Sequence, residues 1–330
     1  MRKAALFYNP LSGNRRERRL ADIDSALRVL TNHGIEASAA ATLGPAQAAG
    51  QARQAIAEGC DTIFACGGDG TIHDVLQGMV GTEAALGIIP LGTANALAHD
   101  LRLPLSAAGA VKATLIAVAR RIAVGKIAFQ KFGGGIGERY FIIAAGVGLD
   151  AHLFYKLNAL HKQRFGMGAY YLKAWHLWAT HKLRFFPVQY TDEATGKPEQ
   201  ADVTQLLAVR IANFGGLLRQ LAPGASLARN DLRLVLCKTD RRSSYLSYVL
   251  RGLIGERRAV RGVELAHSEK ISCGHSMESS GGAKIPVDSS STGNVGKIYV
   301  EADGELLGYL PAEISMVPDA VTLLFPNSGR

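Results

Sequence analysis

Short apolar runs alternate with helical stripes over the first third of the chain. The runs have the length and composition of buried strands and span residues 4–8, 35–42, 62–66 and 84–90. A helical stripe between the first two runs consists of Leu20, Ile23, Leu27 and Leu30. An alanine-rich helix is expected to open at Gly44-Pro45 and to end near Gly59. Strands alternating with helices predict a parallel sheet covered on both faces, here over residues 1–124.

The pattern changes near Gly125, where short β-rich runs replace the alternation. These runs span residues 140–145, 206–212, 232–237 and 297–301. They predict a second, mainly antiparallel β domain over residues 125–312, with a helical insert at 151–183. The Ser- and Gly-rich stretch 272–296 is predicted to be a loop. We expect the last segment, 313–330, to pack back on the first domain.

Composition narrows the class of protein. A chain of 330 residues is long enough for two domains. No run approaches the ~18 apolar residues of a membrane span. The four cysteines are far apart and form no C-x-x-C pair, which argues against a zinc site or a disulfide framework and favours a reducing cytoplasm. The net charge of +9 favours anionic partners: phosphorylated ligands, nucleic acid or an anionic membrane. No nucleic-acid recognition motif accompanies the charge, so we expect no nucleic acid partner.

Two glycine-rich turns each follow a strand and precede a helix. The first is Gly67-Gly68-Asp69-Gly70-Thr71 and the second runs from Pro90 to Asn95. Glycine lets a backbone turn tightly and approach a phosphate, and a helix N-terminus supplies free N–H donors. Asp69 would repel a phosphate unless it holds a magnesium ion or accepts hydrogen bonds from turn amides. The alternatives are a plain turn with a capping Asp, and a Thr N-cap at Thr93.

Two further motifs carry polar groups near chain turns. Asn9-Pro10-Leu11-Ser12-Gly13 follows the first strand, and its amides and hydroxyl suit a phosphate. The arginine-rich stretch 15–19 behind it, which includes Glu17, is explained equally well as a solvated helix face. Asp303-Gly304-Glu305 follows the run 297–301, and Asp-Gly is also the commonest hairpin turn. Each of these two signals is weak when taken singly.

The ordered set of motifs resembles the diacylglycerol kinase catalytic-domain family, which includes bacterial lipid kinases, ceramide kinases and sphingosine kinases. The family pattern is N-P-x-S-G, G-G-D-G-T, P-x-G-T-x-N and D-G-E, and all four occur here in that order. Weaker matches lie at residues 145–151, 215–216 and 221–223. The resemblance implies an N-terminal parallel-sheet nucleotide domain of the NAD kinase/diacylglycerol kinase type and a C-terminal antiparallel β-sandwich.

The resemblance also implies an activity and its residues. The activity is transfer of the γ-phosphoryl group of ATP, with Mg²⁺, to a lipid hydroxyl. Asp303 is expected to be the general base, with Glu305 as its rival, and His73 and Asp150 are assigned to the lipid substrate. The residues expected to bind the nucleotide are Asn9, Pro10, Ser12, Gly13, Thr42, Gly67, Gly68, Asp69, Gly70, Thr71, Gly92, Thr93 and Asn95.

Departures from the family pattern concern a metal site and the acceptor. Bacterial members carry a structural magnesium beside an acidic residue after the proline, where this chain has Gly224, and Ala228-Arg229 replace an acidic pair. That metal site is expected to be degraded, with the carbonyls of Leu221 and Ser226 as its remaining ligands and Asp69 as a weak candidate elsewhere. His73 is more typical of sphingosine and ceramide kinases, so the acceptor stays open.

A lipid kinase must reach a bilayer. Residues 151–191 contain no acid and interleave lysines and arginines with aromatics, which suits an anionic membrane surface or, equally, a packed helix pair. We expect a cytoplasmic protein bound peripherally to the inner face of the membrane, with a homodimer as a further expectation. The competing hypotheses are an NAD kinase, whose family shares G-G-D-G, and a non-catalytic lipid- or nucleotide-binding protein on the same scaffold.

Overall fold

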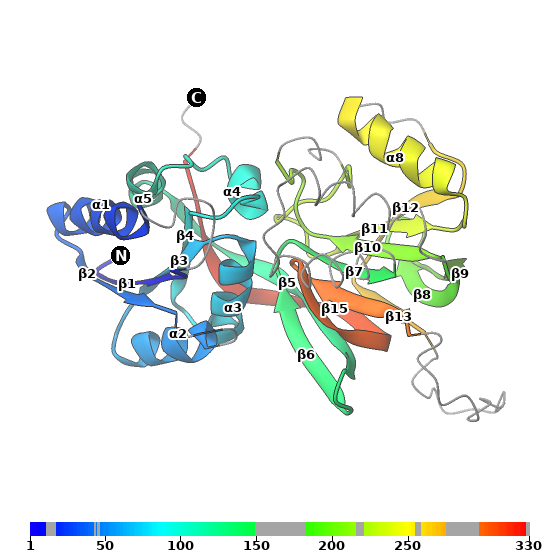
Figure 1. Cartoon of the computed structure of the whole chain (residues 1–330), viewed down its shortest axis with the longest axis horizontal. Helices are drawn as coiled ribbons and strands as arrows, with labels where there is room; N and C mark the ends of the chain where they lie inside the picture. The colour runs from blue at the N-terminus through cyan, green and yellow to red at the C-terminus, as the bar shows by residue number, and fades with distance from the viewer. Residues whose placement is uncertain are drawn as a thin grey trace.

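The structure, a computed structural model, describes residues 1–10, 18–42, 44, 47–148, 183–215, 221–254, 259–274 and 297–327. Its N-terminal part is a parallel sheet in which neighbouring strands follow the order β2, β1, β3, β4 (Figure 1). The bounds of these strands are β1 Lys3–Tyr8, β2 Glu36–Ala41, β3 Thr62–Gly67 and β4 Ala85–Pro90. The predicted parallel sheet is therefore confirmed.

Helices cover both faces of this sheet (Figure 1). The helices of the parallel part are α1 Arg19–Asn32, α2 Ala48–Ala57, α3 Asp69–Met79, α4 Ala96–Asp100 and α5 Ala107–Leu115. Apolar side chains of α1 and α5 pack with one face of β1 and β3, and those of α2 and α3 pack with the other. None of the helices in the described part of the chain is long and apolar enough to cross a bilayer.

The buried stripe of α1 differs from the predicted one. Leu20 is 67 % exposed, and the helix instead buries Arg19, Ile23, Ala26 and Leu30. The buried face of α1 is therefore rotated about the helix axis relative to the predicted one. The prediction considered only large aliphatic side chains, whereas the buried positions include an arginine and an alanine. The buried arginine matters because its Nη2 donates to the carbonyl oxygen of Leu91 at 2.9 Å, just after β4.

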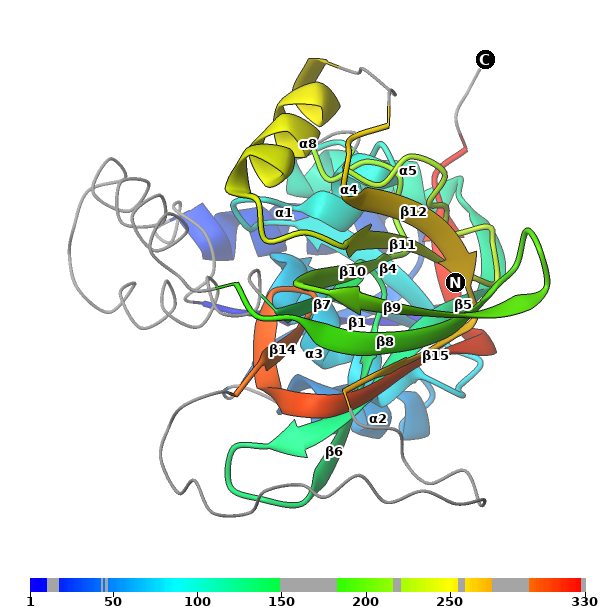
Figure 2. The same cartoon turned by 90° about the vertical axis from the view of Figure 1, so that its right-hand side faces the viewer.

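The second part of the chain is a mainly antiparallel β structure, as predicted (Figure 2). Its strands are β5 Val118–Lys131, β6 Ile136–Phe141, β7 Ala144–Gly148, β8 Phe186–Asp192, β9 Lys197–Val203, β10 Gln205–Val209, β11 Leu232–Cys237, β12 Val263–Ser268, β13 Lys270–Cys273, β14 Tyr299–Ala302 and β15 Glu305–Phe325. One helix, α8 Arg242–Ile254, lies beside β12. The predicted insert 151–183 falls almost wholly outside the described residues, as do residues 275–296 of the predicted loop.

The run 140–145, predicted as one strand, is two strands. β6 ends at Phe141 and β7 begins at Ala144, and β6 pairs with β5 whereas β7 pairs with β10 and β14. Ile142 and Ile143 between them are buried, so hydrophobicity continues across the break and hides it from a reading of the sequence. The break turns the amides of this short link toward Asp303, as described below.

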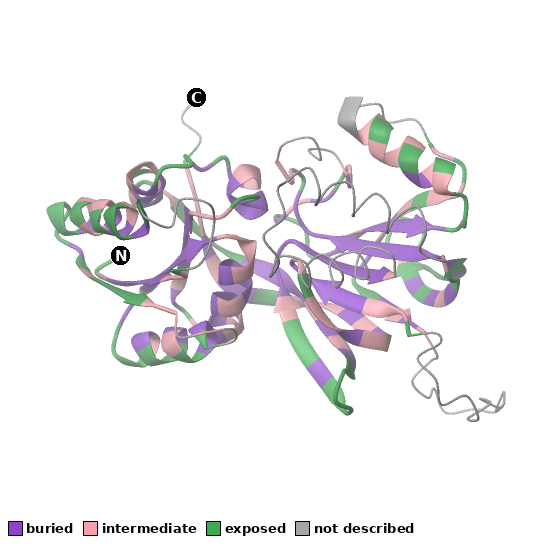
Figure 3. Ribbon diagram, in the orientation of Figure 1, coloured by how far each residue is buried: buried purple, intermediate pink, exposed green. Residues whose placement is uncertain are grey.

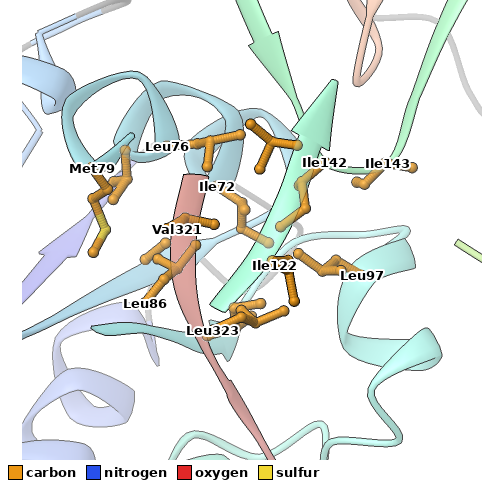
Figure 4. Packing of buried hydrophobic residues seen from close by; sticks show 14 of the residues in the cluster. Ile72, Leu76, Met79, Leu86, Leu97, Ile122, Ile142, Ile143, Val321 and Leu323 are labelled. Atoms are coloured by element: carbon orange, nitrogen blue, oxygen red, sulfur yellow. The ribbon is translucent and has the colours of Figure 1, made fainter. Parts of the chain in front are cut away.

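Strand β15 joins the two parts. Its first half pairs antiparallel with β14, β13 and β5, and Thr322 and Leu323 near its end pair in parallel with β4. The apolar core is continuous through this junction. Figure 4 shows Ile72 and Leu76 of α3, Leu86 of β4 and Val321 of β15 converging with Ile142, and Figure 3 shows the buried ribbon running through both parts.

Candidate active site

The predicted nucleotide motifs meet at the carboxyl ends of the parallel strands. The amide of Leu91, after β4, donates to the carbonyl of Gly67 at 2.9 Å, and the amide of Asn9, after β1, donates to Cys66 at 3.4 Å. The amide of Thr42, after β2, donates to Tyr8 at 2.9 Å. Four strand ends are therefore tied laterally at one edge, which is where ligands of open α/β sheets bind.

The two glycine turns touch each other. A Cβ placed on Gly92 would lie 2.3 Å from the Cα of Gly68, so a side chain at position 92 cannot be accommodated without movement. Asn95 closes the second turn on itself: its Oδ1 accepts from the amide of Gly92 at 2.9 Å, and its Nδ2 donates to the Gly92 carbonyl at 3.0 Å. Asn95 has a left-handed backbone (φ 51°) and is 7 % exposed. Its amide group therefore shapes the turn.

Asp69 links the first turn to the second. Its carboxylate accepts hydrogen bonds from the amides of Ala96 at 3.1 Å and Leu97 at 3.4 Å, at the start of α4. Burial raises the pKa of this carboxyl, the two amides act in the opposite direction, and the nearby charge of Asp303 adds to the rise. Of the two ways in which an acid could be tolerated beside a phosphate, the structure provides the hydrogen bonds to turn amides.

The remaining residues predicted to bind the nucleotide or the substrate differ in their exposure to solvent. Thr71 is 6 % exposed and packs its side chain against Gly67, where an added Cβ would lie 2.3 Å from the Thr71 hydroxyl oxygen. Thr93 and Pro10 are exposed at the same sheet edge. Ser12, Gly13 and Asp150 lie outside the described residues.

We expect Gly92→Ala to damage activity and stability together. The new methyl group would force the turns apart, and a displacement of about 1 Å at a reacting centre costs on the order of 10²-fold in rate. Overpacking should lower the free energy of unfolding by about 1–3 kcal/mol. Steady-state kinetics and urea unfolding measure both effects. Gly50→Ala is the control, because a Cβ at Gly50 of α2 meets nothing within 4 Å; equal behaviour of the two variants would contradict close contact between the turns.

Asp303 is buried between the two parts of the chain. Its carboxylate accepts hydrogen bonds from the amides of Ile142 at 3.1 Å, Ile143 at 2.9 Å and Ala144 at 3.1 Å. Its side chain has 0 % exposure, and its backbone has φ 50°, the left-handed conformation that Asp tolerates in turns. The amide of Asp303 also donates to the Ala144 carbonyl at 2.8 Å. This carboxylate therefore holds the link between β6 and β7.

His73 contacts the same carboxylate from the other part of the chain. Its Nδ1 lies 3.3 Å from Oδ2 of Asp303, and the residue is 3 % exposed on α3. Burial lowers the pKa of the imidazole, but the hydrogen bond to Asp303 and the charges of Asp303, Asp74 and Glu305 outweigh it, so that the pKa is raised. His73 was assigned to the substrate, yet its observed contact is with Asp303.

Glu305 is the exposed acid of the Asp-Gly-Glu motif. A Cβ placed on Gly70 would lie 2.9 Å from its Oε1, so the carboxylate lies directly against the first glycine turn. Partial burial raises the pKa of Glu305; the His73 charge opposes this rise, and the charges of Asp74 and Asp303 add to it. A carboxylate from the start of β15 thus meets the first turn of α3.

Other polar residues fix the two parts relative to each other, and sequence reasoning did not find them. The Gln77 side chain of α3 donates to the Tyr140 carbonyl at 2.8 Å and accepts from its amide at 3.0 Å. Asp100 of α4 accepts from the amides of Ala212 and Asn213, each at 2.9 Å, and burial raises the pKa of Asp100 against these two bonds. Both helices begin at glycine turns, so these contacts orient the turns toward β15.

The segment 221–231, expected to retain a degraded metal site, is organised by a guanidinium group. Arg210, which is 0 % exposed, donates from Nη1 to the carbonyls of Arg229 and Asp231, each at 2.7 Å. Its Nη2 donates to Ala123 at 2.9 Å and to Leu227 at 3.3 Å. Burial lowers the pKa of Arg210 to about 10, against the charge of Asp231.

The two carbonyls proposed as remaining metal ligands have partners within the chain. The Leu221 carbonyl accepts from the Tyr248 hydroxyl, and the Ser226 carbonyl accepts from the Arg229 amide at 3.1 Å. The described residues contain no cluster of three or more His, Cys, Asp or Glu side chains able to hold a metal ion. The Arg210 guanidinium supplies a fixed positive charge to the carbonyls of Leu227, Arg229 and Asp231 in the same segment.

Comparison with known proteins gives matches to a family model, to diacylglycerol kinases and to solved structures. Residues 3–127 match the family model of the diacylglycerol kinase catalytic domain. The chain is 29 % identical to a diacylglycerol kinase of Bacillus subtilis (strain 168), covering 99 % of this chain and 97 % of that protein. It is 26 % identical to a diacylglycerol kinase of Staphylococcus aureus (strain bovine RF122 / ET3-1), covering 99 % of this chain and 93 % of that protein.

Solved structures show the same fold at lower identity. The crystal structure of a diacylglycerol kinase from Bacillus anthracis str. Sterne matches with a TM-score of 0.66 and 17 % identity, covering 99 % of this chain and 97 % of that chain. Yeast NADH kinase in complex with NADH matches with a TM-score of 0.52 and 10 % identity, covering 100 % of this chain and 84 % of that chain.

Fold and site together define a two-part kinase architecture, with glycine turns on a parallel sheet facing a carboxylate from a β domain. Within that class, residues 3–127 match the diacylglycerol kinase catalytic domain, and almost the whole chain is similar to diacylglycerol kinases, so the protein is a lipid kinase. The resemblance drawn from the four motifs is thereby confirmed.

Proposed function

We propose that this protein transfers the γ-phosphoryl group of ATP to the hydroxyl group of a lipid, with Glu305 as the general base. The observation that carries the proposal is the position of the Glu305 carboxylate against Gly70 of the first glycine turn. Phosphate-binding turns and a proton acceptor are the two parts that such a reaction needs at one point. Diacylglycerol, ceramide and sphingoid bases remain the candidate acceptors.

The nucleotide part of the proposal rests on main-chain donors. Asn9, Thr42, the turn 67–71 and the turn 92–95 lie at the ends of neighbouring strands, and α3 begins at the first turn with its amide dipoles directed there. Glycine at 67, 70 and 92 allows the close approach of Thr71, Glu305 and Gly68 that shapes these turns. We assign the triphosphate to these turns.

Glu305 is a better base than Asp303 on physical grounds. A general base must reach the proton it removes, within about 2.6–3.2 Å or through one water molecule. Asp303 has no exposed side-chain surface and already accepts hydrogen bonds from three amides. Glu305 is exposed beside the turn, and its raised pKa makes its carboxylate a stronger proton acceptor. Asp303 and His73 are positioning residues in this proposal, since they hold the loop that carries Glu305.

In the proposed reaction, Glu305 accepts the hydroxyl proton of the lipid as the oxygen attacks the γ-phosphorus. The bond from that phosphorus to the bridging oxygen breaks, ADP leaves with the electron pair, and a phospholipid is formed. The Asp69 carboxylate keeps lone pairs beyond the two amide hydrogen bonds that it accepts, and Mg²⁺ prefers one or two carboxylates together with phosphate oxygens and waters. The residues therefore fit a magnesium ion that arrives with ATP, where it would neutralise phosphate charge.

One alternative acceptor is a dinucleotide, because yeast NADH kinase has a related fold. A single assay tests the proposal: labelled ATP with magnesium is incubated with a panel of hydroxyl lipids and, separately, with NAD, and the products are separated by chromatography. We expect label in a lipid and none in the dinucleotide. Label in NAD would support the alternative, and label in neither would support a non-catalytic binding protein.

We assign the protein to the cytoplasmic face of the membrane, where it would bind peripherally. The proposal is supported by the net charge of +9 and by the need to reach a lipid substrate. The basic aromatic segment expected to contact the bilayer lies mostly outside the described residues, so membrane contact is argued below from another element.

A further inference from the structure

The hairpin of β5 and β6 extends beyond the sheet as a narrow projection (Figure 1). Its tip places two large apolar side chains in solvent: Phe132 is 45 % exposed and Ile136 is 61 % exposed. Between them are Gly133, Gly134 and Gly135, and a Cβ on any of these would meet nothing within 4 Å. Figure 3 shows the outer part of the hairpin as mostly exposed. The three glycines at the tip are therefore without close neighbours among the described residues.

Aromatic side chains from three strands gather at the base of this tip. The ring of Phe132 lies 4.8 Å from that of Tyr309 on β15, edge to face, and 6.3 Å from that of Tyr299 on β14. The two tyrosine rings are 5.9 Å apart. Both tyrosines are half-buried, so part of each ring reaches solvent. Tyrosine has an apolar ring with a polar end, which favours the boundary between hydrocarbon and water.

One lysine lies over one of these rings, and further cationic residues are on the same hairpin. The Nζ of Lys297 lies 4.2 Å from the centre of the Tyr309 ring, and Lys297, Lys131 and Arg139 are all exposed. Residues 126–139 contain a single acid, Glu138, which lies 3.4 Å from the Nζ of Lys126. The cations beside the apolar tip therefore outnumber the acids there. Exposed apolar side chains flanked by cationic ones are complementary to an anionic lipid bilayer, which has charged headgroups at its surface and hydrocarbon beneath them.

The hairpin is connected to the proposed catalytic centre in two ways: β5 pairs with β15, which carries Glu305, and the residues after β6 contact Asp303. Tyr309 follows Glu305 by four residues on β15, which corresponds to about 13 Å along an extended strand. At the other end of β6, the residues after Phe141 donate their amides to Asp303. A lipid with its hydroxyl at Glu305 and its chains directed along β15 would reach the aromatic cluster. The half-thickness of a bilayer core is about 15 Å, which is a similar length.

We propose that the β5–β6 hairpin is the element that docks this enzyme on an anionic bilayer. Phe132 and Ile136 enter the boundary between headgroups and acyl chains, Tyr299 and Tyr309 lie at headgroup level, and Lys131, Arg139 and Lys297 contact anionic headgroups. The proposal deepens the proposed lipid kinase function, because it names the surface on which that enzyme meets its substrate.

The test is co-sedimentation with vesicles of phosphatidylglycerol and with vesicles of phosphatidylcholine. Wild-type protein is expected to bind the anionic vesicles, more weakly as salt rises. Loss of one inserted apolar side chain should weaken binding at least ~10-fold in Phe132→Asp and in Ile136→Asp. Ile116→Asp is the matched control: Ile116 is 66 % exposed at the end of α5, away from the hairpin, and its variant should bind like the wild type.

Kinase assays distinguish the docking proposal from the proposed lipid kinase function. With a short-chain acceptor dissolved below its micellar concentration, the hairpin variants should phosphorylate as fast as the wild type. With acceptor in anionic vesicles, they should be slower by about the factor lost in binding. A wild type that binds vesicles through the hairpin but phosphorylates no lipid would refute the proposed function and leave the docking surface standing. Vesicle binding that is absent in the wild type, or equal in Ile136→Asp and Ile116→Asp, would overturn the docking proposal.

Discussion

Glu305→Gln should lower kcat by about 10²–10⁴-fold, the usual contribution of a positioned general base. Glutamine keeps the size and position of the side chain against Gly70 but cannot take the hydroxyl proton. The KM for ATP should change little, because the turns that we assign to the triphosphate remain intact. In the wild type, kcat should rise with pH as the carboxyl deprotonates, at a pH above the ordinary glutamate pKa of 4.5, since burial raises this pKa. Steady-state kinetics over pH 4–8 would measure both effects.

The control is Glu313→Gln on the same strand, where the carboxylate pairs with Lys270 at 2.9 Å. We expect its kcat to equal that of the wild type. Asp303→Asn should behave differently from both, because its main effect is to weaken the hydrogen bonds from residues 142–144 and so to lower the unfolding midpoint. If Asp303→Asn abolished turnover without any loss of stability while Glu305→Gln stayed active, the roles of the two acids would have to be exchanged.

Arg210→Met should lower the free energy of unfolding by about 3–5 kcal/mol, which is typical when one partner of a buried charged arrangement is removed. Methionine fills similar space but leaves the carbonyls of Ala123, Leu227, Arg229 and Asp231 without their observed donor. Urea unfolding followed by circular dichroism would measure the loss. Arg28→Met is the matched control: Arg28 has 74 % side-chain exposure, so the change should be within about 0.5 kcal/mol.

Chelation provides an independent check on the same segment. If Arg210 supplies the positive charge that organises residues 221–231, EDTA should not shift the urea midpoint of the wild type. A midpoint that falls on chelation and recovers with magnesium would mean that a metal ion, and not the guanidinium group, stabilises this segment.

The sequence predicted the parallel sheet and the motif turns because both have local signatures. Apolar runs of strand length and glycines directly after them depend on neighbouring residues in the chain. The sequence also predicts that the turns of Gly68 and Gly92 lie near each other, because the carboxyl ends of parallel strands meet at one edge of the sheet. The distinct roles of Asp303 and Glu305 could not be predicted in this way. Two acids two residues apart look equivalent in a sequence, and only the placement of Ile142–Ala144 shows which one is buried.

Other features depend on partners far away in the chain. Gln77 and Asp100 are ordinary helix residues whose role appears when β6 and the residues after β10 lie against them. Arg210 follows an apolar strand and was not singled out, because its partners are main-chain carbonyls that carry no residue-specific signal. The break between β6 and β7 was hidden because Ile142 and Ile143 continue the apolar pattern.

The pairing of Thr322 and Leu323 with β4 bears on the order in which this protein can assemble. During synthesis, the first four parallel strands leave the ribosome long before their fifth neighbour is made. The edge of β4 therefore lacks its β15 partner until the whole β domain has been synthesised. The parallel-sheet half is thus among the first parts translated and the last to be completed, and a nascent chain stalled before residue 322 has an unpaired β4 edge.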